Sequence, residues 1–417
     1  METNRTIAVI GGGIVGITAA LELQRRGHAV TLIERGEPGR ETSYGNTGVL
    51  SDASIVISNN PGLLKKLPRF IAGKSDALRY DPVFVAQRLP WVLRFLGHCT
   101  EEHSDHAGRS LRALQSVSLD IHKQLIGEAR ADDLLRHTGW LKAFRSPAGL
   151  AGYRAELELL EANGVSLIHY GADELRQIEP GLKPVFHAGI LLDSCCSVSS
   201  PAKLCDAYAG LFTAAGGTVL RNEVRNISPV DGGWKIDFPD GGSLQTHITV
   251  IAAGPWSREV AGWLGYRIPM AWERGYHLHL DPGNGPPLRR AIHDVERGYV
   301  MTPQEQGVRV TSGVELAARD APINDRQIRA CVASARETAD FGPDIEDDPW
   351  MGRRPSMIDS LPVIGRAPRH DGLWFDFGHG HSGLGGSTGS ARLLADLMHD
   401  TKPPFDAAPF SPTRFRL

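Results

Sequence analysis

Three glycines near the start of the chain have the spacing of a phosphate-binding turn. Gly11, Gly13 and Gly16 form a Gly-x-Gly-x-x-Gly pattern. Where such a turn joins a strand to a helix, backbone N–H groups and the positive end of the helix can contact a pyrophosphate. Glu34 ends the next apolar run, where its carboxylate can accept hydrogen bonds from an adenosine ribose. The pattern predicts a dinucleotide site, and an acid at this position disfavours NADP.

The elements that must position this turn can be read from the same region. The apolar run 6–10 predicts a strand, the helical periodicity of 14–26 predicts a helix that ends at Gly27, and 29–33 predicts a second strand. This order is a βαβ unit, which builds a parallel sheet. The apolar run 248–253 precedes another glycine and is expected to return the chain to that sheet.

The remaining segments predict a second domain. Amphipathic helical patterns at 83–95 and 110–129 fill the region after Pro61. Such an insertion forms part of a second domain, covers a ligand or serves only as scaffold, and the sequence leaves these alternatives open. The predicted fold is mixed α/β. A Rossmann-like dinucleotide domain with a parallel sheet is expected at 1–60, 195–262 and 345–417, and a substrate-binding domain with a mixed sheet and helices at 61–194 and 263–344. Other expected elements are helices 200–215 and 325–339 and strands 218–220, 234–238, 276–280 and 308–312.

Composition narrows the class of protein. The 45 Lys and Arg residues nearly balance the 48 Asp and Glu residues, and the chain contains no run of like charges. We therefore expect no nucleic acid as a partner. The five cysteines form no Cys-x-x-Cys pair and the histidines form no metal motif, so we expect no metal and a reduced, cytoplasmic setting. The uncharged stretch 6–21 contains Gly11, Gly12 and Gly13, which would interrupt a signal or membrane helix. We expect no transmembrane segment, while peripheral contact with the inner face of the membrane stays open.

Four further segments carry a resemblance to a known family. They are the small polar loop 42–48, the strand and turn 251–257, the stretch 350–365 (WMGRRPSMIDSLPVIG) and the glycine-histidine loop 378–383. Together they resemble the D-amino acid oxidase superfamily of FAD-dependent oxidoreductases over essentially the full length. Within it, the chain looks most like the bacterial D-amino acid dehydrogenases, and Arg354-Pro355-Ser356 with Asp359-Ser360-Leu361-Pro362 looks like their D-hydroxyproline dehydrogenase branch.

The resemblance implies that FAD is the cofactor. The 378–383 loop then enters a helix whose amides face the pyrimidine end of the flavin, where negative charge collects on reduction. No cysteine or histidine here matches the covalent flavin links of some relatives, so non-covalent FAD is expected. The residues expected to contact FAD are Gly11, Gly13, Ile14, Val15, Gly16, Glu34, Arg35, Thr42, Ser43, Asn46, Thr47, Gly48, Val224, Ala253, Gly254, Trp256, Gly352, Arg354, Gly380, His381, Ser382 and Gly383.

The same resemblance suggests the catalytic and substrate-binding residues. Arg354 matches the arginine that grips the substrate carboxylate in relatives, and adjacent side chains of a strand face opposite ways, so Arg353 should point elsewhere. Tyr276 either hydrogen-bonds the substrate or is an ordinary aromatic residue of a sheet, and Tyr44 is a weaker candidate of the same kind. His379 is either a catalytic base or a contact of the loop with the flavin.

These residues together predict oxidative deamination of a small D-amino acid, including cyclic ones such as cis-4-hydroxy-D-proline, by hydride transfer from Cα to flavin N5. The electrons would pass to quinone, another carrier or oxygen. Two alternatives remain: oxidation or demethylation of an N-methyl amino acid such as sarcosine or a derivative of proline betaine, and a non-catalytic flavoprotein subunit of an oxidase complex.

Overall fold

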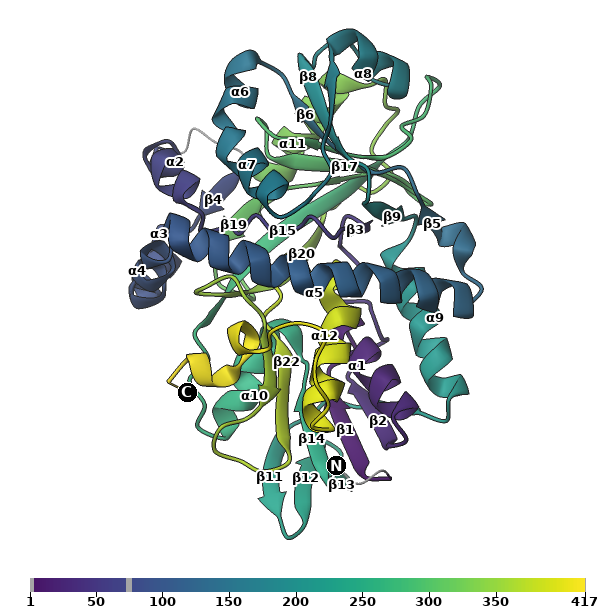
Figure 1. Cartoon of the computed structure of the whole chain (residues 1–417), viewed down its shortest axis with the longest axis vertical. Helices are drawn as coiled ribbons and strands as arrows, with labels where there is room; N and C mark the ends of the chain where they lie inside the picture. The colour runs from purple at the N-terminus through teal and green to yellow at the C-terminus, as the bar shows by residue number, and fades with distance from the viewer. Residues whose placement is uncertain (1–3, 73–76, 417) are drawn as a thin grey trace.

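The computed structural model describes residues 4–72 and 77–416, which form two large sheets with a long helix between them (Figure 1). The first sheet has six strands in the order β10-β2-β1-β14-β22-β21. Its first five strands are parallel, and β21 runs antiparallel to β22. The predicted Rossmann-like parallel sheet is confirmed. Its strands are β1 (Thr6–Ile10), β2 (Ala29–Glu34), β10 (Thr218–Arg221), β14 (Ile248–Ile251), β21 (Val363–Arg366) and β22 (Leu373–Phe377).

Alternating side chains of this sheet enter two separate cores. Ile7 and Val9 of β1 pack in one core with the helices α1, α5, α9 and α12, while Ala8 and Ile10 pack in the other with the small antiparallel sheet β11-β12-β13. Burial on both faces is typical of parallel sheets. The elements concerned are α1 (Ile14–Arg25), α5 (Glu101–Glu128), α9 (Pro201–Ala214), α10 (Ser257–Trp263), α12 (Gly383–Met398), β11 (Asn226–Val230), β12 (Gly233–Asp237) and β13 (Ser243–Thr246).

The second sheet has ten strands, most of them antiparallel. Nine follow the order β4-β19-β15-β18-β17-β16-β6-β8-β7, and β20 pairs with β15. The expected mixed sheet is therefore present, and β20 brings residues after 345 to it. The strands are β4 (Leu78–Tyr80), β6 (Trp140–Phe144), β7 (Ile168–Gly171), β8 (Ala188–Leu192), β15 (Met270–Leu280), β16 (Ala291–Asp294), β17 (Tyr299–Gln304), β18 (Gly307–Thr311), β19 (Val314–Leu316) and β20 (Trp350–Met357).

Two predicted helices have different limits in the structure. The segment 83–95 forms two helices, α3 (Pro82–Gln87) and α4 (Leu89–Gly97), because Pro90 cannot donate a backbone hydrogen bond and begins a new helix. The helix expected at 110–129 begins earlier, at Glu101, because Thr100 caps it and its Oγ1 accepts from the His103 N–H at 3.2 Å. This helix, α5, crosses the molecule between the two sheets (Figure 1).

The remaining elements cover the second sheet or connect it to the first. A short three-stranded sheet has the order β3-β9-β5. In it, β9 pairs with β3, which follows the loop after β2, and with β5, which precedes β6 of the second sheet. No helix among residues 4–72 and 77–416 is both long and apolar enough to cross a membrane. These elements are β3 (Val49–Leu50), β5 (Leu135–Arg136), β9 (Cys196–Val198), α2 (Pro61–Ile71), α6 (Pro147–Gly152), α7 (Arg154–Ala162), α8 (Ala172–Ile178) and α11 (Arg326–Thr338).

Candidate functional site

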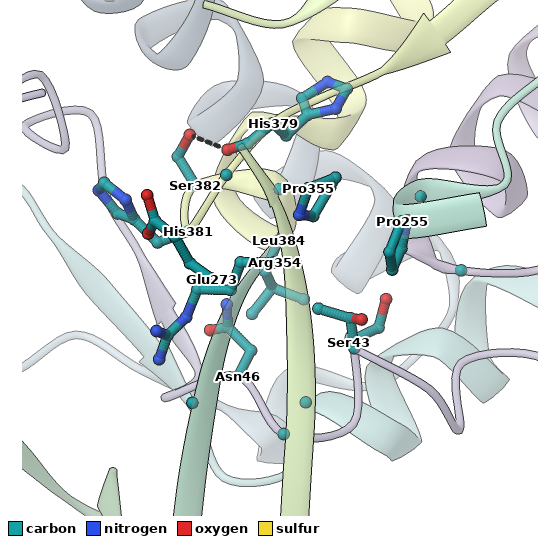
Figure 2. Close-up of a pocket in the computed structure, with 18 of the residues that line it drawn as sticks. Ser43, Asn46, Pro255, Glu273, Arg354, Pro355, His379, His381, Ser382 and Leu384 are labelled. Atoms are coloured by element: carbon teal, nitrogen blue, oxygen red, sulfur yellow. Dashed lines mark hydrogen bonds between the residues drawn. The ribbon is translucent and has the colours of Figure 1, made fainter. Parts of the chain in front are cut away.

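A cavity of about 640 Å³ is lined by both large sheets and by the loops that follow β1, β14 and β22. These loops leave the carboxyl ends of parallel strands, where ligands bind in open α/β sheets. Side chains from β15 and β20 of the second sheet line it too, among them Glu273 and Arg354 (Figure 2). The site is thus built between the two sheets.

The glycine turn has the geometry that the sequence predicted for it. Gly11 has a φ of +109°, and a Cβ there would lie 2.5 Å from the Ala252 carbonyl oxygen, while a Cβ on Gly16 would lie 1.8 Å from the Gly11 carbonyl oxygen. Neither position accepts a side chain. Gly13 differs because a Cβ there would have room, with Ser43 Oγ the nearest atom at 3.5 Å, and the residue lines the cavity. Two glycines therefore permit the turn, and the third leaves space at the start of α1.

Glu34 and Arg35 line the cavity beyond this turn. Glu34 Oε2 accepts from the Gly12 N–H at 2.7 Å, and Oε1 accepts from the Gly36 N–H at 3.1 Å. The Arg35 guanidinium lies 4.0 Å from the centroid of the Trp256 ring. This end of the cavity combines an anchored carboxylate with a flat stacked surface, which suits a ribose and an aromatic base.

The loop after β2 is held by hydrogen bonds to three distant segments, two through side chains of the loop itself and one through Arg309. Ser43 Oγ accepts from the Ile14 N–H at 2.9 Å, and Thr42 Oγ1 donates to the Arg353 carbonyl oxygen at 2.8 Å. Arg309, a buried residue of β18, donates from Nη1 to the carbonyl oxygens of Tyr44 and Asn46, each at 2.7 Å. Burial lowers the pKa of Arg309 to about 10. The sequence reasoning missed Arg309, although an arginine inside the apolar strand GVRVT is a visible signal.

A second helix begins at the cavity wall. Gly380, His381, Ser382 and Gly383 line the cavity just before and at the start of α12, which begins at Gly383. Ser382 Oγ donates to the His379 carbonyl oxygen at 2.9 Å, the contact drawn in Figure 2. With α1 and α12 both starting here, the positive ends of two helices face one cavity.

His379 belongs to a buried network behind this loop. Its Nε2 lies 3.0 Å from Ser390 Oγ, which donates to Asp376 Oδ1 at 2.5 Å. Burial lowers the pKa of His379 to about 3 and raises the pKa of Asp376 to about 8. A neutral imidazole with its Nε2 already engaged is a poor base near neutral pH, so this placement favours the loop-contact interpretation of His379.

Arg354 enters the cavity from β20. Its strand pairs with β15 so that Arg354 is opposite Glu273 and Gly352 is opposite Gly275. Arg354 Nη1 donates to the Gly313 carbonyl oxygen at 3.0 Å, and a Cβ on Gly275 would lie 2.3 Å from Arg354 Nη2. The guanidinium thus lies across the bare backbone of Gly275. Burial raises the pKa of Glu273, and the charge of Arg354 opposes that rise.

Arg353 points away from the cavity. Its Nε donates to the Arg319 carbonyl oxygen at 2.8 Å, and its Nη2 lies 3.6 Å from Asp320 Oδ1. The two neighbouring arginines therefore face opposite sides of β20, as a strand requires.

The two candidate tyrosines lie outside the cavity wall. Tyr276 is 1% exposed, and its hydroxyl donates to Glu315 Oε2 at 2.5 Å and accepts from Arg274 Nη2 at 2.8 Å. This ion-paired setting favours the interpretation of Tyr276 as an aromatic residue of the sheet. Tyr44 packs its ring against His277 and Trp350, with centroids 5.8 and 5.7 Å away.

Most residues expected to contact the cofactor line this cavity. Gly16 and Gly48 do not line it; a Cβ on Gly16 would lie 1.8 Å from the Gly11 carbonyl oxygen, and one on Gly48 2.6 Å from the Val198 carbonyl oxygen, so both glycines allow close backbone packing. The sequence reasoning also missed Glu273, Trp140, Lys142 and His293 of the opposite wall. The expected cofactor residues in the wall are Gly11, Gly13, Ile14, Val15, Glu34, Arg35, Thr42, Ser43, Asn46, Thr47, Val224, Ala253, Gly254, Trp256, Gly352, Arg354, Gly380, His381, Ser382 and Gly383.

A glycine turn, a ribose-binding acid and two helix N-termini around one cavity define a dinucleotide-binding protein of the α/β class. The family model described as "DAO: FAD dependent oxidoreductase" matches residues 6–397, and the chain belongs to this family of FAD-dependent oxidoreductases.

Relatives and solved structures agree with this assignment. The chain is 32% identical to a D-amino-acid oxidase of Bradyrhizobium diazoefficiens, with both chains covered completely. It is 30% identical to D-amino acid dehydrogenase 2 of Ralstonia nicotianae, covering 98% of this chain and 100% of the relative. Glycine oxidase of Geobacillus kaustophilus has the same fold, with a TM-score of 0.75 at 21% identity over 99% of this chain and 100% of the other.

The residues present fit FAD. Gly13 leaves space at the start of α1 for a pyrophosphate, Glu34 can reach a ribose, and the start of α12 can face a flavin ring. FAD is the cofactor of this family, and these groups would hold its two ends.

Proposed function

We propose that this protein oxidises the bond between the α-carbon and the nitrogen of a small D-amino acid. The observation that carries the proposal is Arg354, a guanidinium in the cavity wall that lies across Gly275 and near the start of α12 (Figure 2). A planar guanidinium binds a carboxylate with two parallel hydrogen bonds. Two full-length relatives are named as a D-amino-acid oxidase and a D-amino acid dehydrogenase, which supports the same chemistry and stereochemistry.

The residues of the chain act mainly by orientation. Arg354 Nη1 donates to the Gly313 carbonyl oxygen at 3.0 Å and Nη2 to the Ser312 carbonyl oxygen at 3.4 Å, which fixes the plane of the guanidinium and leaves the second N–H of each nitrogen for the substrate. Anchoring the carboxylate aligns the α-hydrogen for transfer. FAD supplies the two-electron acceptor for the hydride that leaves the α-carbon. The positive end of α12 stabilises negative charge that develops nearby.

Proton transfer needs no base from the chain. Hydride loss requires a neutral substrate amine, and water can take the ammonium proton before the transfer. His379, with a pKa of about 3, is neutral throughout the range near pH 7 and supports the loop instead. The resulting imino acid then hydrolyses to an oxo acid or stays as a cyclic imine.

The division of the chain and the finer choice of substrate belong to the same proposal. We assign FAD binding to the segments 1–60, 195–262 and 345–417, and the substrate side to 61–194 and 263–344. Strand β20 of the last FAD segment joins the second sheet, so its Arg354 belongs to the substrate side as well. The likeness of Arg354-Pro355-Ser356 to D-hydroxyproline dehydrogenases makes cis-4-hydroxy-D-proline one candidate substrate. Sarcosine and other N-methyl amino acids, the alternative that the sequence leaves open, are the second candidates.

The test uses two neighbouring arginines as a matched pair. Arg354→Met should raise the KM for the substrate by about 100-fold, from roughly 3 kcal/mol of lost charged hydrogen bonds. Arg353→Met removes the same charge on the other side of β20 and should leave KM within about threefold. Equal effects of both variants, or unchanged turnover in Arg354→Met, would contradict the role of Arg354 and favour a non-catalytic subunit.

We propose further that the electrons pass to quinone or another carrier at the inner face of the membrane, with the protein cytoplasmic. The support is a set of exposed apolar side chains on α2, α3 and α4, namely Leu64, Ile71, Val83, Leu89 and Leu93, with the exposed Lys65 next to Leu64 in the chain. Such a basic and apolar surface suits anionic lipid.

Sedimentation with vesicles tests this location. Vesicles with anionic lipid should carry the protein down, neutral vesicles should carry less, and Leu93→Ser should weaken both. Equal recovery with and without vesicles would contradict membrane contact.

A further inference from the structure

The cavity wall supplied by the second sheet carries an aromatic and basic cluster. Trp140 and Lys142 lie two residues apart on β6, so their side chains share one face of the strand. β16 runs parallel to β6, with His293 paired to Lys142. All three residues line the same cavity as Arg354.

Lys142 is a buried amine without a carboxylate partner. It is 5% exposed, its Nζ lies 3.3 Å from His293 Nδ1, and Nζ lies 3.2 Å from the centroid of the Trp140 ring. Within residues 4–72 and 77–416, no carboxylate oxygen lies within 4.0 Å of this Nζ. A buried lysine is usually paired with an acid because burying an unpaired charge is costly.

The neighbours of Lys142 do not supply the missing negative charge. Burial holds the pKa of His293 well below its usual range, and the charges of Lys142 and Lys66 lower it further, so the imidazole is neutral. Trp140 adds a second donor, since its buried Nε1–H has no hydrogen-bond partner in the described structure. The cluster therefore combines a basic amine in the cavity wall with a buried indole N–H that has no partner in the described structure.

We propose that Lys142, together with Trp140 and His293, binds the side-chain carboxylate of an acidic D-amino acid while Arg354 binds the α-carboxylate. This inference rests on the proposed function and deepens it by naming the substrate class. A carboxylate near Lys142 would restore the partner that the folded chain lacks, and the Trp140 N–H could donate to the same anion.

The charges of Arg354 and Lys142 both affect one residue of the cavity wall, His381. The pKa of His381 is lowered to about 4 by burial first and then by the charges of Arg354 and Lys142. Two cations that face one space suit a substrate with two carboxylates better than one with a single carboxylate. The subsite thus favours D-aspartate or D-glutamate over D-alanine or the cyclic candidate.

Substrate pairs that differ only in charge test this subsite in the holoenzyme. Anaerobic flavin reduction is measured with two such pairs, D-glutamate with D-glutamine and D-aspartate with D-asparagine. D-alanine and cis-4-hydroxy-D-proline are measured as substrates that have no side-chain carboxylate. The acidic member of each pair should have the lower KM, by between about 10-fold and 100-fold. Equal KM values within each pair, with the flavin still reduced, overturn the subsite alone. No reduction by any D-amino acid overturns the proposed function, and the subsite with it.

Variants separate a substrate contact from a structural role. Lys142→Met should raise the KM for D-glutamate by about 10-fold to 100-fold and leave the KM for D-glutamine within about threefold, while Lys142→Arg should restore most of the difference. Trp140→Phe, which removes only the N–H donor, should raise the KM for D-glutamate alone. Lys402→Met, at an exposed lysine, is the control.

Thermal unfolding supplies a readout that does not depend on activity. Burial lowers the pKa of Lys142 to about 7, so the folded protein disfavours its charged form. Lys142→Met should therefore raise Tm, because a functional charge without a partner destabilises the free enzyme. A lower Tm together with equal losses for every substrate would identify Lys142 as structural and overturn the proposal.

Discussion

Replacing Gly275 by alanine is expected to disable substrate binding without unfolding the protein. Gly275 lies on β15 beneath the guanidinium of Arg354, and its strand partner is Gly352. A Cβ at this position would lie 2.3 Å from Arg354 Nη2, 2.5 Å from Cζ and 2.8 Å from Nη1. Ordinary contact between such atoms needs roughly 3.5 Å, so the guanidinium must move by about 1 Å.

The size of the effect follows from that movement. A misplacement of about 1 Å in a positioning group can lower kcat/KM by about 100-fold. Stability should change by only about 1 kcal/mol, because the colliding atoms are the far end of a flexible side chain and the main loss is the hydrogen bond from Arg354 to the Gly313 carbonyl oxygen. The variant should therefore fold, bind FAD and reduce it slowly.

The assay is anaerobic flavin reduction at several substrate concentrations, with a double-mutant cycle. Gly275→Ala should add little to the loss already caused by Arg354→Met, because both changes act on the same guanidinium. Gly210→Ala is the matched control, since it lies in α9 with no atom within 4 Å of the new Cβ, and it should stabilise the protein by about 0.5–1 kcal/mol with unchanged kcat/KM. Additive losses in the cycle, or normal turnover in Gly275→Ala, would refute the reasoning.

Three further predictions concern the cofactor, the sheet and pH. Gly11→Ala should lose bound FAD, because its Cβ would meet the Ala252 carbonyl oxygen at 2.5 Å on a backbone with φ of +109°. Visible absorbance per protein measures the bound FAD, and a variant with full flavin absorbance would contradict the site. Tyr276→Phe should lower Tm and leave KM unchanged, because it removes a buried hydrogen bond to Glu315 worth about 1–2 kcal/mol. A large rise in KM would instead indicate that Tyr276 contacts the substrate. The folded-state pKa of His379, about 3, lies below its unfolded value, so stability should fall as pH drops from about 6.5 towards 3. His379→Asn should flatten that loss in thermal melts and leave the pH profile of flavin reduction near neutrality unchanged, and a shifted profile would indicate a catalytic base.

Local signals were sufficient for the dinucleotide half of the fold. The run from Thr6 to Glu34 alternates strand, glycine turn, helix and strand within a short stretch, and each glycine has a steric role that a sequence pattern can express. The break at Pro90 between α3 and α4 is equally local, but the amphipathic pattern continues across it and predicts a single helix.

The substrate wall could not be predicted in the same way because it depends on pairing between distant strands. Lys142 and His293 meet only because β6 and β16 are neighbours, although they are far apart in the chain. Tyr276, in contrast, is a candidate from the sequence whose hydroxyl lies outside the cavity wall. The family resemblance suggested a substrate contact, but the pairing of β15 with its neighbours turns its hydroxyl to Glu315.

The most direct test of the central claim is anaerobic mixing of the purified holoenzyme with each enantiomer of a panel of amino acids, including glutamate, alanine and 4-hydroxyproline. Loss of the flavin absorbance with a D-compound but not with its L-enantiomer is the result that the proposed function predicts, because two full-length relatives are named for D-amino acids. With the carboxylate anchored at Arg354 and the side chain also held, the two enantiomers direct their α-hydrogens differently. An absorbance that persists with every amino acid, or that is lost equally with both enantiomers, would contradict the account.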